Sequence, residues 1–234
     1  MSRLDSFIDA AYTTGAVADA GGGQIPVLPT SVERAEGEAL RDLAVREGAS
    51  QTIETGFALG MSALFLCQAV LTVDPEGGHH VAIDPHQQAS WKAAGLTSLA
   101  AAGVDGRVEV IEEESELALP QLVREGRKFD LAFVDGNHRF EGVLLDLVFM
   151  ERLVKPGGLI VADDMWMPSA RVAVAYVERN LDLELEPNAV PNAFSWRRGS
   201  KWRRRGLKGT GRVALMRLPA APPARPWDRF DAFT

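Results

Sequence analysis

The sequence predicts a doubly wound α/β fold, with a mostly parallel seven-stranded sheet and helices on both faces. Five short apolar segments of strand type are each followed by a segment of helical type, which is the pattern of parallel strands joined by crossover helices. The strand segments are almost continuously apolar, as expected for strands buried on both faces. Each of the five also ends at an acidic residue, and parallel strands end at one edge of the sheet.

The predicted elements begin at Ser31, which starts a capped amphipathic helix running to residue 46. The first strand follows at 51–53, and strand and helix then alternate. We expect further strands at 80–83, 108–111, 131–134 and 159–162, and helices at 61–72, 89–101, 117–125, 142–154 and 170–180.

The strand and helix pattern predicts one domain, residues 31–218. Residues 1–30 contain three consecutive glycines and two prolines, so we expect an irregular amino-terminal arm. The segments 181–186 and 213–218 can supply two final strands as an antiparallel pair at the sheet edge. Residues 219–234 are predicted to form a tail, and the sequence indicates neither an internal repeat nor a second domain.

Composition indicates a globular protein. The chain has 234 residues, of which 46% are hydrophobic and 24% are charged, as is ordinary for a soluble domain. The longest apolar stretch, 63–73, is too short to span a bilayer, and the amino terminus lacks a signal-peptide pattern. We therefore expect a cytoplasmic protein with no membrane partner. The single cysteine, Cys67, excludes an internal disulfide and a multi-cysteine zinc site, and we expect it in the core.

Charge is unevenly distributed along the chain. The net charge of −7 argues against a nucleic-acid partner for the surface as a whole. Residues 196–212 nevertheless carry eight Lys or Arg and no acid. This basic segment is either a solvated loop or a docking surface for an anionic acceptor, and the sequence leaves both alternatives open.

The loop after the first predicted strand, residues 54–62, has the sequence ETGFALGMS. Gly56 and Gly60 allow a tight turn and close approach of a ligand to the backbone, and the following helix start offers N–H groups. The Gly-x-Gly-x-x-Gly pattern of a dinucleotide site is absent, which argues against an NAD-dependent oxidoreductase. Glu54 and Asp84, at two successive strand ends, instead suit a cationic amino-acid group and a ribose diol.

These residues resemble the class I S-adenosylmethionine-dependent methyltransferases, over about residues 30–180. The loop looks like their first motif, Asp84 like the acid that binds the ribose, and residues 114–115 like the adenine-side segment. Ala58 departs from the motif, because many relatives have a central glycine there. The resemblance implies a Rossmann-like sheet, S-adenosylmethionine as cofactor, and contacts to it from Glu54, Gly56, Gly60, Ser62, Asp84, Glu114, Ser115 and Asp135.

Three acids follow two other strand ends, at Asp135 and at Asp163-Asp164. If these strands are adjacent, the carboxylates lie close together and favour a hard cation held by oxygen, chiefly Mg²⁺, with Mn²⁺ or Ca²⁺ as alternatives. The competing interpretation is that Asp163 or Asp164 caps the next segment and no metal binds. His138 can take a proton from a substrate hydroxyl, since imidazole titrates near neutrality, or it can be a helix cap or face solvent.

The resemblance extends to this second group of residues. Asp135, Asp163 and Asp164 fall where the metal-dependent catechol-type O-methyltransferases place their metal ligands, with Asp164 in place of the usual asparagine. His138 falls where those enzymes carry a catalytic lysine. Asp-x-x-His followed by a paired acid is more similar to the macrocin and mycinamicin sugar O-methyltransferases, in which histidine is the base. The resemblance implies methylation of a small-molecule hydroxyl, such as that of a natural-product sugar or polyol, and a homodimer or larger oligomer.

Two other functions stay open at this point. A methyltransferase that acts on a nucleic acid or another anionic acceptor would use the basic segment, and strong salt dependence of binding would mark it. A non-catalytic Rossmann-like binding protein would use the acids as caps. His79 and His80 are predicted to lie in a turn at the surface, and Trp166 and Met167 suit either an apolar wall over the acceptor or plain packing.

Overall fold

The structure is a computed structural model that describes residues 1–186, 212–221, 226 and 230–232. The chain divides into two compact units, Met1–Ala118 (the amino-terminal unit) and Leu119–Thr234 (the carboxyl-terminal unit). The basic segment, apart from Arg212, and most of the predicted tail lie outside the described residues. The elements in chain order are α1 (Arg3–Thr14), β1 (Ala16–Ala18), β2 (Gln24–Pro26), α2 (Arg34–Arg46), β3 (Gln51–Thr55), α3 (Met61–Val73), β4 (His79–Ile83), α4 (Ala94–Ala102), the 3₁₀ turn η1 (Asp105–Arg107), β5 (Val108–Ile111), α5 (Ser115–Arg124), β6 (Phe129–Val134), α6 (Phe140–Leu153), β7 (Val154–Ala162), α7 (Pro168–Asn180), β8 (Glu184–Leu185) and β9 (Ala214–Arg217).

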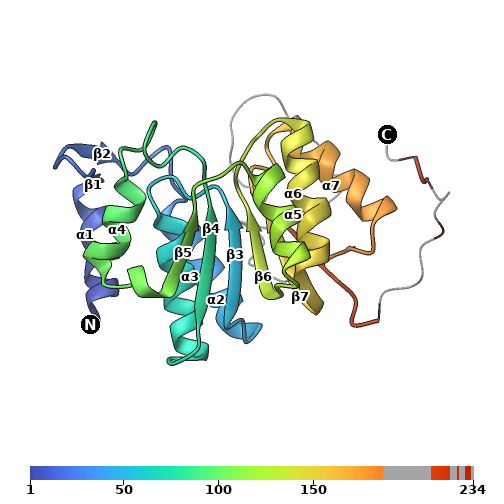
Figure 1. The fold of residues 1–234 in the computed structure, drawn as a ribbon, viewed down its shortest axis with the longest axis horizontal. Helices are drawn as coiled ribbons and strands as arrows, with labels where there is room; N and C mark the ends of the chain where they lie inside the picture. The colour runs from blue at the N-terminus through green and yellow to red at the C-terminus, as the bar shows by residue number, and fades with distance from the viewer. Residues whose placement is uncertain (187–211, 222–225, 227–229, 233–234) are drawn as a thin grey trace. The chain divides into compact units, whose positions relative to one another are not determined.

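Three parallel strands form the sheet of the amino-terminal unit, in the order β5-β4-β3 (Figure 1). The register pairs Thr55, the last residue of β3, with Ile83, the last residue of β4. The N–H of Gly56 continues this ladder by donating to the carbonyl of Ile83 at 2.9 Å. The loops that begin at Gly56 and Asp84 therefore leave the sheet at the same edge.

Helix α3 is buried over most of its surface, which explains why its sequence is apolar all round rather than amphipathic. It packs against β3 and β4 and lies beside α2. Gly37 of α2 makes this close approach feasible, because a Cβ atom there would lie only 2.1 Å from the ring of Phe65. Cys67 is fully buried in α3, as predicted, and burial raises the pKa of its thiol above the ordinary value.

The prediction of an irregular arm over residues 1–30 is wrong, because this segment begins with the regular helix α1. Ser2 and Asp5 form a capping box, in which the Ser2 hydroxyl accepts the N–H of Asp5 and the Asp5 carboxylate accepts the N–H of Ser2, both at 3.0 Å. The glycines at 21–23, on which the prediction rested, belong to the β1–β2 turn, and the capping pattern of Ser2 and Asp5 is the local signal for the helix.

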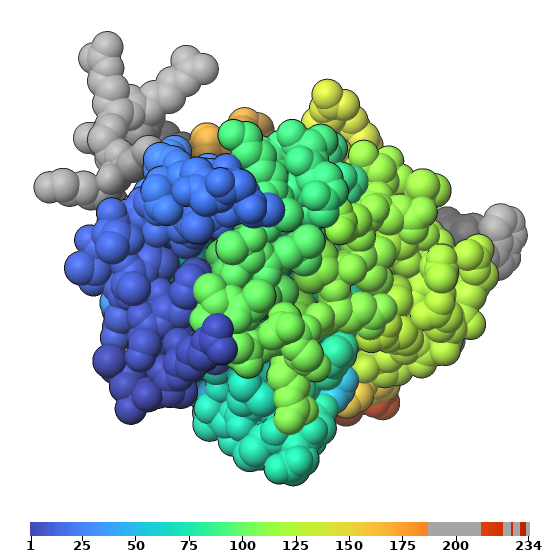
Figure 2. Space-filling view, turned by 60° about the vertical axis from the view of Figure 1, so that its left-hand side comes forward, coloured from blue at the N-terminus to red at the C-terminus, as the bar shows by residue number. Residues whose placement is uncertain are grey.

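Helix α1 is also packed on the rest of its unit. Leu4 and Ile8 are buried, and Arg3 donates to the carbonyls of Ala100 and Ala101 in α4 at 3.0 and 2.8 Å. Figure 2 shows the blue amino-terminal segment lying against the green segment that contains α4. The arm is therefore an integral layer of the amino-terminal unit.

The strands of the carboxyl-terminal unit follow the order β6-β7-β9-β8. Strands β6 and β7 are parallel, and Val134 pairs with Ala162 at their ends. Strand β9 is antiparallel to both β7 and β8, so the predicted antiparallel pair of final strands is confirmed. Helices α6 and α7 pack side by side, and α6 contacts β6 and β7 (Figure 1).

Strands β3 to β9 form one mostly parallel sheet of seven strands with helices, which confirms the predicted doubly wound α/β fold. Two predicted details are wrong. Helix α2 begins at Arg34 and has no side-chain cap, so Ser31 is not its cap. Strand β7 begins at Val154, within the predicted helix, because that helix ends at Leu153. Among the described residues, no helix has the length and apolar character needed to cross a membrane.

The capping box of α1 gives a prediction about pH. The pKa of Asp5 is lowered from 3.8, first by the Ser2 backbone N–H and then by Gln68 and the Ser2 hydroxyl. A carboxyl group whose pKa is lowered by folding stabilises the fold at pH values above its unfolded-state pKa. This stabilisation is lost as the pH falls through the folded-state pKa. We expect Asp5→Asn to lower the free energy of unfolding by roughly 0.3–1 kcal/mol at pH 7, the range for an exposed acid in the first turn of a helix. In urea titrations the difference from the wild type should shrink below pH 3.8, and a constant difference would contradict this.

Candidate functional site

The loop between β3 and α3 turns tightly through three residues in the left-handed region. Gly56, Ala58 and Gly60 have φ values of 87°, 43° and 81°. Glycine adopts this conformation at little cost, whereas for alanine it costs about 1–2 kcal/mol. Ala58 is the residue that departs from the family motif, and it takes the backbone conformation that a glycine would favour.

Asp84 holds this loop in place. Its Oδ2 accepts the N–H of Ala58 at 2.6 Å and that of Phe57 at 3.3 Å, while its Oδ1 accepts the N–H of His86 at 2.7 Å. The carboxylate is therefore buried but well hydrogen-bonded, and it joins the loop after β3 to the loop after β4. Each oxygen has more than one acceptor direction, so the same carboxylate can also accept a ribose hydroxyl. The assignment of Asp84 to the ribose stays a prediction.

Helix α3 begins at this loop, with Gly60 as its N-cap and the buried Ser62 in its first turn. A helix start presents N–H groups without intrahelical partners and a partial positive charge, which suit the carboxylate of an amino-acid ligand. A Cβ atom on Gly60 would lie 3.1 Å from the ring of Phe57, and one on Gly95 would lie 2.4 Å from it. The two glycines therefore let Phe57 pack beneath the loop.

Glu54 lies in the interior of the unit rather than on the surface of the loop. Its carboxylate and the ring of His80 are both fully buried, with Oε1 3.4 Å from Nε2 of the histidine. The other ring nitrogen, Nδ1, lies 2.8 Å from the hydroxyl of Thr52. The prediction that His80 lies in a surface turn is wrong, because it is an inward-facing residue of β4. The contact of Glu54 with the cofactor stays a prediction.

The predicted adenine-side residues lie at the start of α5. Glu114 is exposed, and its carbonyl accepts the N–H groups of Leu117 and Ala118, both at 3.0 Å. Ser115 is the first helical residue and is partly exposed. Both are accessible to a ligand, and their predicted role is not tested by the contacts within the chain.

A second group of residues lies at the strand ends of the carboxyl-terminal unit. The register of β6 with β7 brings the two loops together, and the N–H of Asp163 donates to the carbonyl of Val134 at 2.9 Å. One ligand atom from each of Asp135, His138 and Asp164 lies within 4.8 Å of the others. We call these three residues the acid–histidine cluster.

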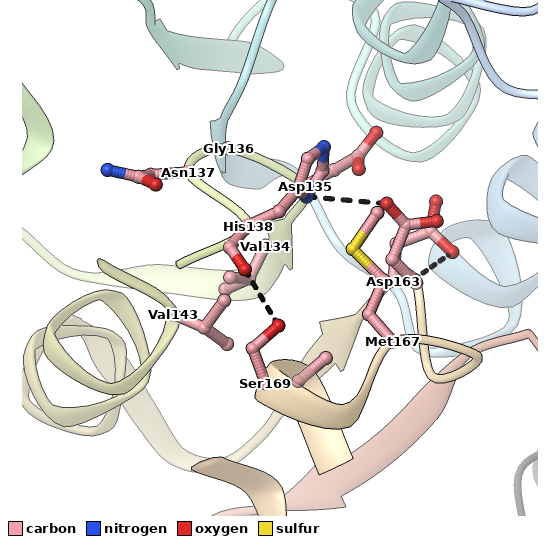
Figure 3. Close-up of a pocket in the computed structure, with 11 residues that line it drawn as sticks. Val134, Asp135, Gly136, Asn137, His138, Val143, Asp163, Met167 and Ser169 are labelled. Carbon is pink, nitrogen blue, oxygen red and sulfur yellow. Dashed lines mark hydrogen bonds and ion pairs between the residues drawn. The ribbon is translucent and has the colours of Figure 1, made fainter. Parts of the chain in front are cut away.

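Within the cluster, Nδ1 of His138 lies 3.3 Å from Oδ2 of Asp164 (Figure 3). The histidine side chain is 47% exposed and that of Asp164 only 11%. The backbone carbonyl of His138 accepts the hydroxyl of Ser169 at 2.7 Å, which ties this loop to the start of α7. The imidazole of His138 therefore lies at the surface. The backbone of this residue and one ring nitrogen are both restrained by neighbouring residues.

The cluster borders a small hollow that is open to solvent. Asn137 points away from it (Figure 3), since its side chain accepts the N–H of Arg139 at 3.0 Å. The hollow combines polar groups on one side with apolar walls, and its lining includes Val134, Asp135, His138, Val143, Asp164 and Met167.

Asp163 does not belong to the cluster. Its side chain is fully buried, and its Oδ1 accepts Nε of Arg212 at 3.1 Å and the N–H of Asp164 at 2.6 Å. Burial raises the pKa of Asp163 above its ordinary value, while the Arg212 guanidinium acts in the opposite direction. The assignment of Asp163 as a metal ligand stays a prediction, and its observed contacts are with Arg212 and the next residue.

Neither acid of the pair caps the following helix. The N-cap of α7 is Met167, which makes no side-chain capping bond, and the carbonyl of Asp164 accepts the Met167 N–H at 2.7 Å. Asp164 instead directs its carboxylate to His138 and to the indole N–H of Trp166. The interpretation of these acids as caps of α7 is therefore excluded.

The cluster fits a divalent cation by its donor chemistry. Two carboxylates and one imidazole converge from two loops, and carboxylate oxygens suit Mg²⁺ while the mixed set also suits Mn²⁺. All three residues were predicted from the sequence, although the histidine was assigned only a catalytic role. Arg212 was missed as an individual residue, because nothing in the basic segment distinguishes that arginine from its neighbours.

The chain is similar to known proteins in its sequence as well as in its fold. Residues 53–165 match the sequence model of a family described as a methyltransferase domain. This match confirms the resemblance to methyltransferases over residues 53–165. An Arabidopsis thaliana protein that carries the name of a caffeoyl-CoA O-methyltransferase is 35% identical over 136 residues, which are 56% of this chain. The match covers 53% of that relative, so the chain spans about half of its length.

Solved O-methyltransferase structures share the fold over nearly the whole chain. The O-methyltransferase of Bacillus cereus in complex with SAH has a TM-score of 0.67 at 16% identity, and the match covers 92% of this chain and 90% of that chain. TomG of Streptomyces achromogenes, an O-methyltransferase involved in tomaymycin synthesis and solved with SAM, has a TM-score of 0.64 at 20% identity, over 94% and 90% of the two chains. At these identities the likeness shows a common fold.

The left-handed loop gives a prediction with a matched pair of variants. We expect Gly60→Ala to lower the free energy of unfolding by roughly 1–2 kcal/mol, because alanine disfavours its φ of 81° and the new Cβ would crowd Phe57. Ala58→Gly should be tolerated, since glycine relieves the strain at that position. Urea unfolding measures both, and an equal loss in the two variants would refute this account of the loop.

Proposed function

We propose that the protein transfers a methyl group from S-adenosylmethionine to a hydroxyl group of a small-molecule acceptor, with a divalent cation and His138 at the acceptor hydroxyl. The acid–histidine cluster is the observation that carries this proposal. Beside an open hollow, it would supply ligands for a cation and a proton acceptor for the hydroxyl. The match to a methyltransferase domain and the O-methyltransferase names of the relatives support the reaction type.

The proposed cofactor site uses the loop after β3 and the start of α3. Gly56 and Gly60 let the ligand approach the backbone, and the helix start attracts the carboxylate of the methionine part. Asp84, already fixed by the loop N–H groups, would accept the ribose hydroxyls without needing to reorganise. The residues of this chain thereby bind and orient the cofactor.

In the proposed acceptor site, Asp135 and Asp164 would hold Mg²⁺ or Mn²⁺. Such a cation supplies Lewis-acid activation, which lowers the pKa of an alcohol oxygen, and it also positions that oxygen. The buried Asp164 and the half-buried Asp135 are fixed to adjacent strand ends, so their oxygens are preorganised. Mg²⁺ is our first choice because carboxylate ligands predominate.

His138 would remove the proton of the acceptor hydroxyl. Its Nδ1 faces the Asp164 carboxylate at 3.3 Å, which leaves Nε2 as the nitrogen that accepts the proton. A carboxylate beside one imidazole nitrogen orients the ring, as in other general-base pairs. The 47% exposure of the side chain lets the proton pass on to solvent.

The walls of the hollow indicate the kind of acceptor. Val143 and Met167 present apolar surface next to the polar cluster, which suits a molecule with both a hydroxylated edge and an apolar face. A natural-product sugar or polyol has this character, and we propose it as the acceptor class. The alternative of an anionic acceptor depends on the basic segment, and no contact of the described residues favours it.

The first test is calorimetric titration of S-adenosylmethionine into the protein, with Mg²⁺ and again with a chelator. We expect saturable binding in both conditions, because the predicted cofactor residues other than Asp135 lie outside the cluster. Absence of binding in both would refute the methyltransferase proposal before any acceptor is tested.

The second test addresses turnover with a panel of hydroxylated sugars and polyols, measured as release of S-adenosylhomocysteine. We expect His138→Ala and Asp135→Asn each to lower turnover about a hundredfold or more, as is usual when a general base or a cation ligand is lost. His79→Ala, a histidine substitution in β4 outside the cluster, is the matched control and should retain activity. Full activity of both cluster variants, or of the wild type in chelator, would refute the proposed mechanism, in which a cation and His138 act on the hydroxyl.

A further inference from the structure

Asp164 has an unusual backbone for a residue with a side chain. Its φ of 55° lies in the left-handed region, where aspartate and asparagine are tolerated better than most residues but are still strained. Such a conformation persists only where the surroundings restrain it. The contacts of Asp164 therefore show which neighbours determine where its carboxylate points.

The shortest contact of the Asp164 side chain comes from Trp166. Its indole N–H donates to Oδ1 of Asp164 at 2.6 Å, and the turn between them is closed by the bond from the Met167 N–H to the Asp164 carbonyl. The backbone of Trp166 is itself held, because Arg171 donates to its carbonyl at 2.6 Å and to that of Met165 at 3.1 Å. Arg171 of α7 thus holds the backbone of the residue whose indole N–H is the donor.

The two oxygens of Asp164 have different partners. Oδ1 accepts the indole N–H and lies 3.8 Å from Nη2 of Arg212, whereas Oδ2 faces His138. The bond from Trp166 therefore sets the rotation of the carboxylate, and it directs Oδ2 toward the cluster. Trp166 itself remains 45% exposed.

We propose that Trp166 is a positioning residue for the cation site, which acts through Asp164 by holding Oδ1 so that Oδ2 is presented to the cation. This inference rests on the cation site of the proposed function. It needs no contact of Trp166 with the acceptor, the cofactor or the cation. Partners that orient a ligand in this way typically change metal affinity by 10–100-fold when removed.

The test measures the affinity of the protein for Mn²⁺ by electron paramagnetic resonance, without cofactor or acceptor. Trp166→Phe retains an aromatic ring but loses the N–H, and we expect it to raise the Kd for Mn²⁺ about 10-fold or more. Trp91→Phe, the same exchange in the amino-terminal unit, is the matched control and should leave the Kd unchanged. The affinity for S-adenosylmethionine should be the same in all three proteins.

A double-mutant cycle with Asp164→Gly distinguishes positioning from a general loss of structure. Glycine suits the left-handed backbone, so this variant removes the carboxylate without adding strain. If Trp166 acts through Asp164, adding Trp166→Phe to Asp164→Gly will not weaken Mn²⁺ binding further. Further weakening in the double variant would overturn the proposal.

Two other results would also overturn it, and they differ in what else they reject. An unchanged Kd for Trp166→Phe, with normal Mn²⁺ binding by the wild type, rejects the role of Trp166 and leaves the cation site standing. Absence of Mn²⁺ binding by the wild type rejects the cation site of the proposed function together with this inference. Calorimetric binding of S-adenosylmethionine would still stand in that case.

Discussion

A buried carboxylate that accepts the backbone N–H of a left-handed residue shapes the loop in each of the two units. In the amino-terminal unit Asp84 accepts the N–H of Ala58, and in the carboxyl-terminal unit Asp163 accepts that of Asp164, each at 2.6 Å. Charge-assisted bonds of this kind are strong, and they offset the strain of a positive φ in residues that carry a Cβ atom. The loops that carry the proposed chemistry depend on them.

The same bonds explain how the interior tolerates so much acid. An isolated buried charge is costly, and the acids gathered at the strand ends would oppose folding if each lacked a partner. Asp84 accepts N–H groups through both oxygens, Asp163 accepts Arg212 and an N–H group through Oδ1, and Asp164 contacts an indole and a histidine. The two adjacent acids therefore have different roles. Asp163 supports the backbone of the loop, and Asp164 directs its carboxylate toward His138.

Much of the fold and part of the site follow from local sequence. Apolar runs ending in acids located the five parallel strands, and the loop glycines marked the turn into α3. The amino-terminal helix was missed because a glycine-rich turn lies beside it, although Ser2 and Asp5 carry a capping signal. His80 was misplaced because two glycines precede the His79-His80 pair, whereas β4 is buried along nearly its whole length and takes His80 into the interior.

The sequence by itself determined the order of strands and helices, the acids at the strand ends and the resemblance to a methyltransferase, because each is expressed in residues close together along the chain. Only the tertiary structure decided which carboxylate serves which purpose. Arg212 lies 49 residues from Asp163 along the chain, and its charge turns that acid toward a supporting role. Trp166 and His138 approach Asp164 from two different loops, so the direction of its oxygens depends on packing and on rotamers. The pairing of β6 with β7 brings His138 to Asp164, and the pairing of β7 with β9 brings Arg212 to Asp163. No local pattern contains these pairings, whereas Trp166 lies only two residues from Asp164.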